Sequence, residues 1–215
     1  MRTSRRVSSW RRCGLLALLA ILTLVWVPVV HTAQLGLSSD DLASFARYKR
    51  FTIYDPYFSK YSKRFFGVGF DWHYFKAQAV AESNLREDVR SPVGAVGVMQ
   101  VMPRTFDEIQ RKNPAITGSI DQPRWNIAAG IWYDRQHFVV WTADRLLVER
   151  LKFMFGSYNA GRASILRAQQ FALGAGLNET LWESVAGELP RVTGRRSQET
   201  VAYVARVLDI KEALR

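Results

Sequence analysis

Helical spacing of apolar residues is the feature that most limits what this chain can fold into. The face that runs from Trp72 to Glu82 repeats at intervals of three and four residues, which is the period of an α-helix. Asp71 directly precedes this face as a candidate N-cap. No segment alternates apolar and polar residues at every second position over the length of a strand. The chain is therefore predicted to be mainly α, with its helices packed around one core.

Start signals and apolar periodicity predict several further helices. The segments are 42–50, 98–109 with an interruption near Pro103, 123–138, 143–155, 162–171 and 198–214. Residues 51–70 differ from these, because they are rich in aromatic side chains, contain Pro56 and end with Gly67 and Gly69. We expect them to form an extended wrap with a short turn in front of the core.

The first 33 residues have the pattern of a targeting segment. They contain five arginines and no acid, and 17 uncharged residues, 14–30, follow the arginines. This order is typical of an export signal or an N-terminal membrane anchor. The apolar run is longer than a usual signal core, yet His31 is a poor residue for a cleavage site, so a cleaved and a retained segment are equally open. In both cases the rest of the chain is predicted to lie outside the cytoplasm.

Charge and cysteine content narrow the function classes once this segment is set apart. Of the formal charge of +11, the five arginines account for nearly half, which leaves 25 basic and 19 acidic residues and a net +6. Export removes the chain from genomic DNA, so we expect no nucleic-acid partner for this surface. The one cysteine, Cys13, lies before the apolar run, and the histidines are scattered. We therefore expect no disulfide, no metal site and no cofactor.

Three segments carry candidate chemistry. Glu82 closes the apolar face, and a carboxyl group in apolar surroundings has a raised pKa and can act as a general acid. The segment SPVGAVGVMQVMP, 91–103, allows tight turns at its glycines, with Gln100 as its strongly polar residue. The segment FGSYNAG, 155–161, ends a helix around a Tyr-Asn pair. The ordinary alternatives are a solvated surface charge, a loop before a core helix and a helix cap at Gly161.

In their order and spacing these motifs resemble the lytic transglycosylase family, typified by soluble lytic transglycosylases and related to goose-type lysozyme. The motifs are Glu82-Ser83, SPVGAVGVMQVMP, the NIAAG of 126–130, SYNAG and the ETVAYV of 199–204. The resemblance covers roughly residues 70 to 210. It implies a single compact lysozyme-like helical domain at 70–215. The residue patterns predict a helical and extended N-terminal wrap at 34–69 and a signal or anchor helix at 1–33 in front of this domain.

The resemblance also implies roles for particular residues. Glu82 matches the single catalytic acid of the family. The residues that it places on the substrate are Ser91, Gln100, Tyr158, Asn159 and Tyr203. Two positions depart from the family pattern: Val201 stands where arginine is frequent, and Arg191 stands where an aromatic residue is frequent. Contacts at that end of the cleft are therefore left open.

The reaction implied by the resemblance cleaves the MurNAc–GlcNAc bond of peptidoglycan without consuming water. The acid protonates the leaving oxygen and then accepts the proton of the sugar's 6-hydroxyl, which leaves a 1,6-anhydroMurNAc end. Peptidoglycan glycan strands would be the partner, on the periplasmic side of a bacterial envelope, with the membrane as a second partner if the N-terminal segment is retained. A lysozyme-type hydrolase would need a second carboxylate, for which the nearest candidates are Glu87, Asp88, Asp107, Glu108 and Asp121. A catalytically silent peptidoglycan-binding protein is the third possibility.

Overall fold

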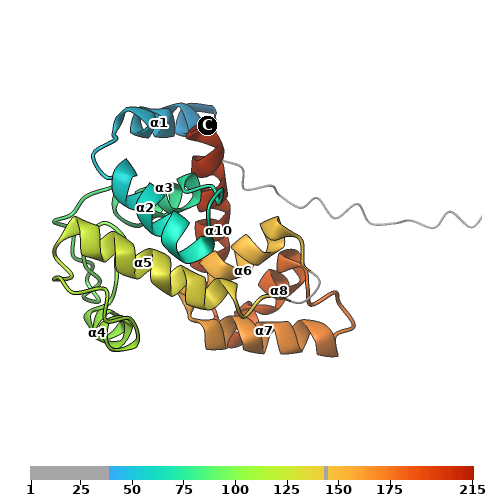
Figure 1. The fold of residues 1–215 in the computed structure, drawn as a ribbon. Coiled ribbons are helices and arrows are strands. Elements are labelled where there is room, and N and C mark those ends of the chain that lie inside the picture. The colour runs from blue at the N-terminus through green and yellow to red at the C-terminus, as the bar shows by residue number, and fades with distance from the viewer. Residues whose placement is uncertain (1–38, 143–144) are drawn as a thin grey trace, which may run out of the picture. The chain divides into compact units, whose positions relative to one another are not determined.

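The computed structural model describes residues 39–142 and 145–215, which belong to one compact unit, Leu35–Arg215 (Figure 1). Its helices follow in the order α1 (Ser39–Ala46), the 3-10 helix η1 (Arg47–Arg50), α2 (Asp55–Phe66), α3 (His73–Ser83), α4 (Pro103–Lys112), α5 (Pro123–Phe138), α6 (Leu147–Ala160), α7 (Arg162–Gly174), α8 (Trp182–Glu188), α9 (Pro190–Thr193) and α10 (Arg196–Ala213). Extended pairing within the described ranges is limited to isolated bridges at Val96, with Arg90 and with Val101. The prediction of a mainly helical fold is confirmed for this part of the chain.

Local sequence signals predicted the ends of some helices to within one turn. α5 begins and ends as predicted, because Pro123 has the φ of a first helical turn and loses no helical hydrogen bond there. α3 begins at His73, so its N-cap is Trp72 and not the predicted Asp71. Asp71 lies one residue earlier, and its Oδ1 accepts from the backbone N–H of His73 at 3.0 Å. α7 and α10 lie within a turn of their predicted limits, and the short helix α1 is also present.

The prediction of an extended wrap over 51–70 is wrong for most of its length, because α2 occupies Asp55–Phe66. Pro56 lies in the first turn of α2, where a missing N–H costs no helical hydrogen bond. Phe58 and Tyr61 are buried three residues apart on one face of the helix, which packs against α5. Gly67, with a φ of 104°, then ends the helix.

The predicted helix at 98–109 is wrong in its first part. The chain forms turns before Pro103, since Gly97 and Gln100 have φ values of 76° and 46°, and α4 begins at Pro103 itself. The predicted helix at 143–155 begins later, at Leu147, and runs to Ala160. The short helices α8 and α9 were not predicted.

The packing encloses α3. It lies against α10 and α2, while α5 and α10 both contact α6, and α6 contacts α7 (Figure 1). Most residues of α3 are buried, including Phe75 and the run from Lys76 to Val80. The helix that carries Glu82 is therefore an interior element with neighbours on several sides.

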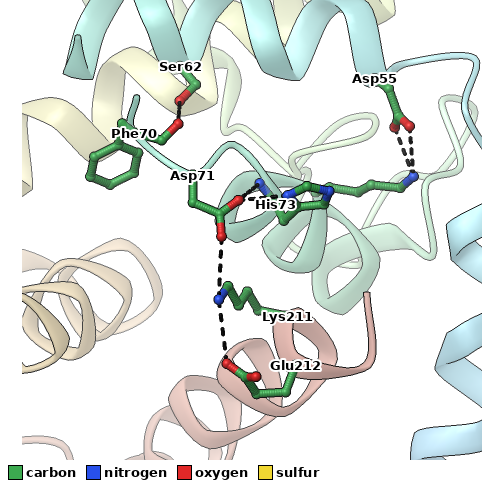
Figure 2. Close-up of polar contacts among 8 residues, drawn as sticks. Asp55, Ser62, Phe70, Asp71, His73, Lys211 and Glu212 are labelled. Atoms are coloured by element: carbon green, nitrogen blue, oxygen red, sulfur yellow. Dashed lines mark hydrogen bonds and ion pairs between the residues drawn. The ribbon is translucent and has the colours of Figure 1, made fainter. Parts of the chain in front are cut away.

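Two buried lysines tie α3 to its neighbours, and Figure 2 shows the contacts of Lys211 with Asp71 and Glu212. Lys76, which is 2% exposed, places its Nζ 2.8 Å from Oδ1 of Asp55 on α2. Lys211 on α10, 1% exposed, places its Nζ 3.4 Å from Oδ2 of Asp71 in front of α3, and the same distance from Glu212. Buried ion pairs of this kind hold an orientation more than they add net stability. They fix the position of α3 between α2 and α10.

The N-terminal prediction is not tested by this part of the chain. None of the described helices combines the length and the apolar character needed to cross a bilayer. The predicted signal or anchor at 1–33 lies outside the described residues. It stays a prediction, as do the boundaries after residues 33 and 69.

Candidate active site

Glu82 lies in the last turn of α3 and contacts the middle of α10. Its Oε1 accepts a hydrogen bond from the hydroxyl group of Tyr203 at 2.6 Å. Asn84 and Leu85 directly after the helix have φ values of 55° and 62°, so the chain turns away just beyond the acid. The contact joins residues that are 121 positions apart in the sequence, which only the packing of α3 on α10 can achieve.

The surroundings of Glu82 keep a proton on its side chain up to neutral pH. Burial raises the pKa of Glu82 to about 7, against a lowering by the hydrogen bond from Tyr203, and the negative charge of Glu199 raises it further. A general acid works best with a pKa near the pH at which it operates. The raised pKa expected from the apolar face of α3 is present.

The turn at 91–102 is held against α3 and α5. The hydroxyl group of Ser83, next to the acid, donates to the carbonyl of Val98 at 2.8 Å. Asn126 on α5 accepts from the backbone N–H of Met99 at 2.8 Å and donates to a second carbonyl of the turn. A Cβ at Gly97 would lie 2.8 Å from the Asn126 side chain, so only glycine fits there. The asparagine of the NIAAG motif therefore shapes the turn that follows the acid.

Tyr158 and Asn159 connect the end of α6 to this turn and to α10. The Tyr158 hydroxyl donates to the carbonyl of Met99 at 2.7 Å. Asn159 Oδ1 accepts from the Thr200 hydroxyl at 2.7 Å. Burial and the charge of Glu82 raise the pKa of Tyr158 well above its ordinary value, so its hydroxyl stays a neutral donor. α6 ends at Ala160, and Gly161 with a φ of 83° is its C-cap, which was the ordinary alternative for this segment.

Gln100 and Ser91 make their hydrogen bonds within the turn. Gln100 donates from Nε2 to the carbonyls of Val89 and Gly97 at 3.1 and 2.9 Å. Ser91 Oγ accepts from the backbone N–H of Ala95 at 2.9 Å. Both side chains therefore stabilise the turn. Their predicted contacts to a glycan stay predictions.

Two neighbouring pockets share Asn159 and Ala160. The smaller, of about 270 Å³, is lined by Gln100, Tyr158 and Asn159 together with parts of α4 and α5. The larger, of about 750 Å³, reaches the α10 residues Arg196, Glu199 and Thr200. Gln100, Tyr158 and Asn159 thus line one pocket. Tyr203 is hydrogen-bonded to Glu82.

Ser91, Glu82 and Tyr203 are not lining residues of these two pockets in the described part of the chain. Val93 of the 91–95 turn lines the larger one. Glu199, which also lines it, precedes Tyr203 by one turn of α10, and its charge acts on Glu82. The larger pocket therefore contains a charged residue that lies one helical turn from Tyr203 and acts on Glu82.

The two departures from the family pattern lie beside the larger pocket. Arg191 is exposed, donates to Glu188 at 2.7 Å and stacks over the ring of Phe171 at 4.0 Å. Its neighbour Val192 lines the pocket, as does Thr200, the neighbour of Val201. Arg191 and Val201 are therefore next in sequence to residues of the pocket wall and do not line it themselves.

The sequence analysis missed a buried carboxyl group near the acid. Asp134 on α5 is fully buried and accepts from Nε2 of Gln78 at 3.3 Å. A signal was present, since Gln78 precedes Glu82 by one helical turn and Asp134 follows Asn126 by eight residues, about two turns. The carboxylates considered earlier as second groups are all exposed, and three form surface ion pairs, namely Asp88 with Arg86, Glu108 with Lys112 and Asp121 with Arg90.

Fold and site together define a lysozyme-like helical domain with one partly buried acid. Solved structures share this fold. The 70 kDa soluble lytic transglycosylase SLT70 from Escherichia coli has a TM-score of 0.58 at 24% identity, covering 85% of this chain and 31% of that chain. The lytic transglycosylase Slt from Pseudomonas aeruginosa, as an inactive mutant, has a TM-score of 0.58 at 23% identity, covering 79% of this chain and 26% of that chain.

The chain belongs to the Transglycosylase SLT domain family, whose model matches residues 58–175. The membrane-bound lytic murein transglycosylase F of Desulfosudis oleivorans is 29% identical over 182 residues, 78% of this chain and 37% of its own length. That of Shewanella pealeana is 27% identical over 150 residues, 70% and 29% respectively. The chain thus spans about a third of the length of these relatives. The resemblance to lytic transglycosylases is confirmed, and Tyr203 alone among the predicted site residues lies beyond the matched range.

Proposed function

We propose that this chain is a peptidoglycan lytic transglycosylase of the bacterial envelope that leaves 1,6-anhydroMurNAc ends. The observation that carries the proposal is the Glu82–Tyr203 pair, a single acid whose pKa burial raises to about 7 and whose Oε1 is held by a tyrosine hydroxyl. Family membership and the names of the relatives, which are murein transglycosylases, support the same conclusion.

In the first step Glu82 acts as a general acid. Its proton passes to the glycosidic oxygen while the bond between that oxygen and C1 of the muramic acid breaks, and the N-acetyl group of the same sugar assists the departure. A carboxyl group with a pKa near 7 holds this proton at neutral pH and releases it without a large penalty. The Tyr203 hydroxyl stabilises the carboxylate that results.

In the second step the same side chain acts as a base. The Glu82 carboxylate accepts the proton of the sugar's 6-hydroxyl as this oxygen bonds to C1, which restores the acid and closes the anhydro ring. No water is consumed, so competing water has to be kept from C1. Two features can keep water away from C1: the apolar interior around α3, and the turn at 91–102, which hydrogen bonds to α3 and α5 hold in place.

The remaining predicted residues are assigned to substrate binding. Gln100, Tyr158 and Asn159 line the smaller pocket, where they can hold polar groups of a sugar ring. We assign Ser91 to the same task through the turn that it closes. The predicted N-terminal segment would place this domain on the periplasmic side, either released or tethered to the membrane.

Digestion of isolated sacculi tests the proposal. Wild-type protein should release soluble muropeptides that mass spectrometry finds one water lighter than reducing-end products, and Glu82→Gln should release none while it still folds and binds sacculi. The substitution removes the titrating proton and keeps the shape of the side chain. Reducing ends would assign a lysozyme-type hydrolase instead. Binding without release by the wild type would indicate a silent peptidoglycan-binding protein.

A further inference from the structure

The buried carboxyl group of Asp134 and the buried amide of Gln78 form a hydrogen bond one helical turn before Glu82. Asp134 on α5 and Gln78 on α3 are both 0% exposed, and Gln78 donates from Nε2 to Asp134 Oδ1 at 3.3 Å. The other oxygen of each group, Oδ2 of Asp134 and Oε1 of Gln78, has no hydrogen-bond partner among the described residues. Buried polar atoms without partners are costly and rare in native proteins.

A single proton on Oδ2 of Asp134 would give both of these oxygen atoms a hydrogen-bond partner. The two unpartnered oxygens are acceptors when Asp134 is ionised, so they can only repel each other. When Oδ2 carries a proton, it can donate to Oε1 of Gln78, and the two planar groups then form a closed ring of two hydrogen bonds. A carboxylic acid and a primary amide match in the spacing of their donor and acceptor atoms, so the two groups suit such a ring.

The electrostatic surroundings favour the same form. The titratable groups whose electrostatics are coupled to Asp134 are Glu82 on α3, Tyr133 on α5, Tyr158 on α6 and Tyr203 on α10. None of these is a cation. Burial raises the pKa of Asp134 well above its ordinary value, against a lowering by the hydrogen bond from Gln78, and the charge of Glu82 raises it further.

We propose that Asp134 is a positioning residue that works as a neutral acid, donating to Gln78 so that α5 holds the turn of α3 that carries Glu82. This role rests on the proposed function of Glu82. When Asp134 is neutral, Glu82 is the one carboxyl group of the two that ionises. An ionised Asp134 would instead oppose the second charge that forms when Glu82 gives up its proton.

The protonation state can be measured without any activity. Infrared difference spectra between Glu82→Gln and the double variant Glu82→Gln/Asp134→Asn should show a protonated carboxyl band at pH 7 that only the Asp134-containing protein carries. The Glu82→Gln background removes the other raised-pKa carboxyl group of the site. A band from an ionised carboxylate in its place would overturn the proposal, whatever the enzyme does to peptidoglycan.

The hydrogen-bond ring is tested by substitution. Asp134→Leu leaves the Gln78 amide without a partner, so we expect a lower unfolding midpoint and a roughly tenfold lower kcat with little change in KM. Asp134→Asn can form the same two hydrogen bonds and should rescue both values, with an unchanged pH profile. If Asp134→Asn loses activity as Asp134→Leu does while it remains folded, the neutral-acid role is wrong.

A double variant covers the case in which Asp134→Leu does not fold. Gln78→Leu/Asp134→Leu replaces both polar groups with apolar ones, and such a change restores stability when the pair is neutral. We expect its unfolding midpoint to return to near the wild-type value, whereas Gln78→Leu alone should lower it. A double variant less stable than both single variants would overturn the pairing. A wild type that is stable and carries the infrared band but releases no muropeptides would refute the proposed function and not the pair.

Discussion

At the scale of single residues, the candidate site depends on hydrogen bonds between side chains that come from separate helices. Glu82 ends an apolar helical face, and burial there raises its pKa to about 7. The hydrogen bond from Tyr203 at 2.6 Å depends on the packing of α10 against α3. The contact between Asp134 and Gln78 depends in the same way on the packing of separate helices. Such contacts have no local signature, because each residue alone looks like an ordinary helical side chain.

Removing the tyrosine hydroxyl should shift the pH dependence of the reaction. The hydrogen bond from Tyr203 lowers the pKa of Glu82 by stabilising its carboxylate. In Tyr203→Phe this stabilisation is lost, so the pKa rises and the protonated acid persists to higher pH. We expect the alkaline limb of kcat/KM to move up by about one pH unit and kcat to fall about tenfold.

The matched control for this prediction is Tyr74→Phe. Tyr74 is half-buried on α3 and keeps its ring contact with Lys211 in that variant. Its pH profile should be that of the wild type. Steady-state rates on soluble glycan fragments between pH 5 and 9 measure both variants, and an unmoved alkaline limb in Tyr203→Phe would remove the tyrosine from the tuning of Glu82.

At the scale of elements, the outcome depended on how a proline or glycine was interpreted. Pro123 predicts a helix start, and α5 begins there. Pro56 predicts an interruption in an aromatic segment, yet it lies in the first turn of α2. The apolar residues before α4 predict a helix, because the positive φ values of Gly97 and Gln100 leave no mark in the sequence. A proline thus indicates a helix boundary. Whether the helix begins or ends there depends on the burial of the residues that follow.

Close packing between α5 and the turn makes Gly130 a sensitive position. A Cβ at Gly130 would lie 2.8 Å from Cβ of Met99, whose backbone groups hold Asn126 and Tyr158. Met99 is fully buried, so it cannot move aside freely. We expect Gly130→Ala to lower the free energy of unfolding by about 1–3 kcal/mol, as overpacked core substitutions do.

Gly187 supplies the control, because it also lies in a helix but a Cβ there meets nothing within 4 Å. Gly187→Ala should leave the stability unchanged or raise it by up to about 1 kcal/mol. Urea unfolding of both variants measures the difference. If Gly130→Ala is as stable as Gly187→Ala, the turn is not held tightly against α5.

At the scale of the whole molecule, the described helices form one unit whose interior contains several titratable groups. Glu82 and Asp134 have raised pKa values, and His137 has a lowered one. The folded state therefore favours the neutral form of each of them. The sequence did not predict this common property, because it depends on burial by helices that are distant in the sequence, and it links stability to pH in two opposite directions.

His137 should weaken the fold in acid. Both of its ring nitrogens are buried without a hydrogen-bond partner among the described residues, and burial lowers its pKa from 6.5 to about 4. Below pH 6.5 the unfolded chain binds a proton that the folded chain does not, so the free energy of unfolding falls as the pH is lowered. The loss from this residue should reach about 3 kcal/mol near pH 4 and then level off.

The variant His137→Phe isolates this contribution, since a phenylalanine ring does not titrate and can keep the ring contact with Tyr133. Acidification also returns stability by protonating Glu82 and Asp134, whose raised pKa values act with the opposite sign. The difference between wild type and His137→Phe cancels this second effect, because both proteins contain those acids. We expect chemical unfolding at a series of pH values to give a difference that is constant above pH 6.5 and changes by about 3 kcal/mol in favour of the variant down to pH 4. A flat difference over that range would mean that His137 is solvated, and that the interior around α5 is more open than the structure shows.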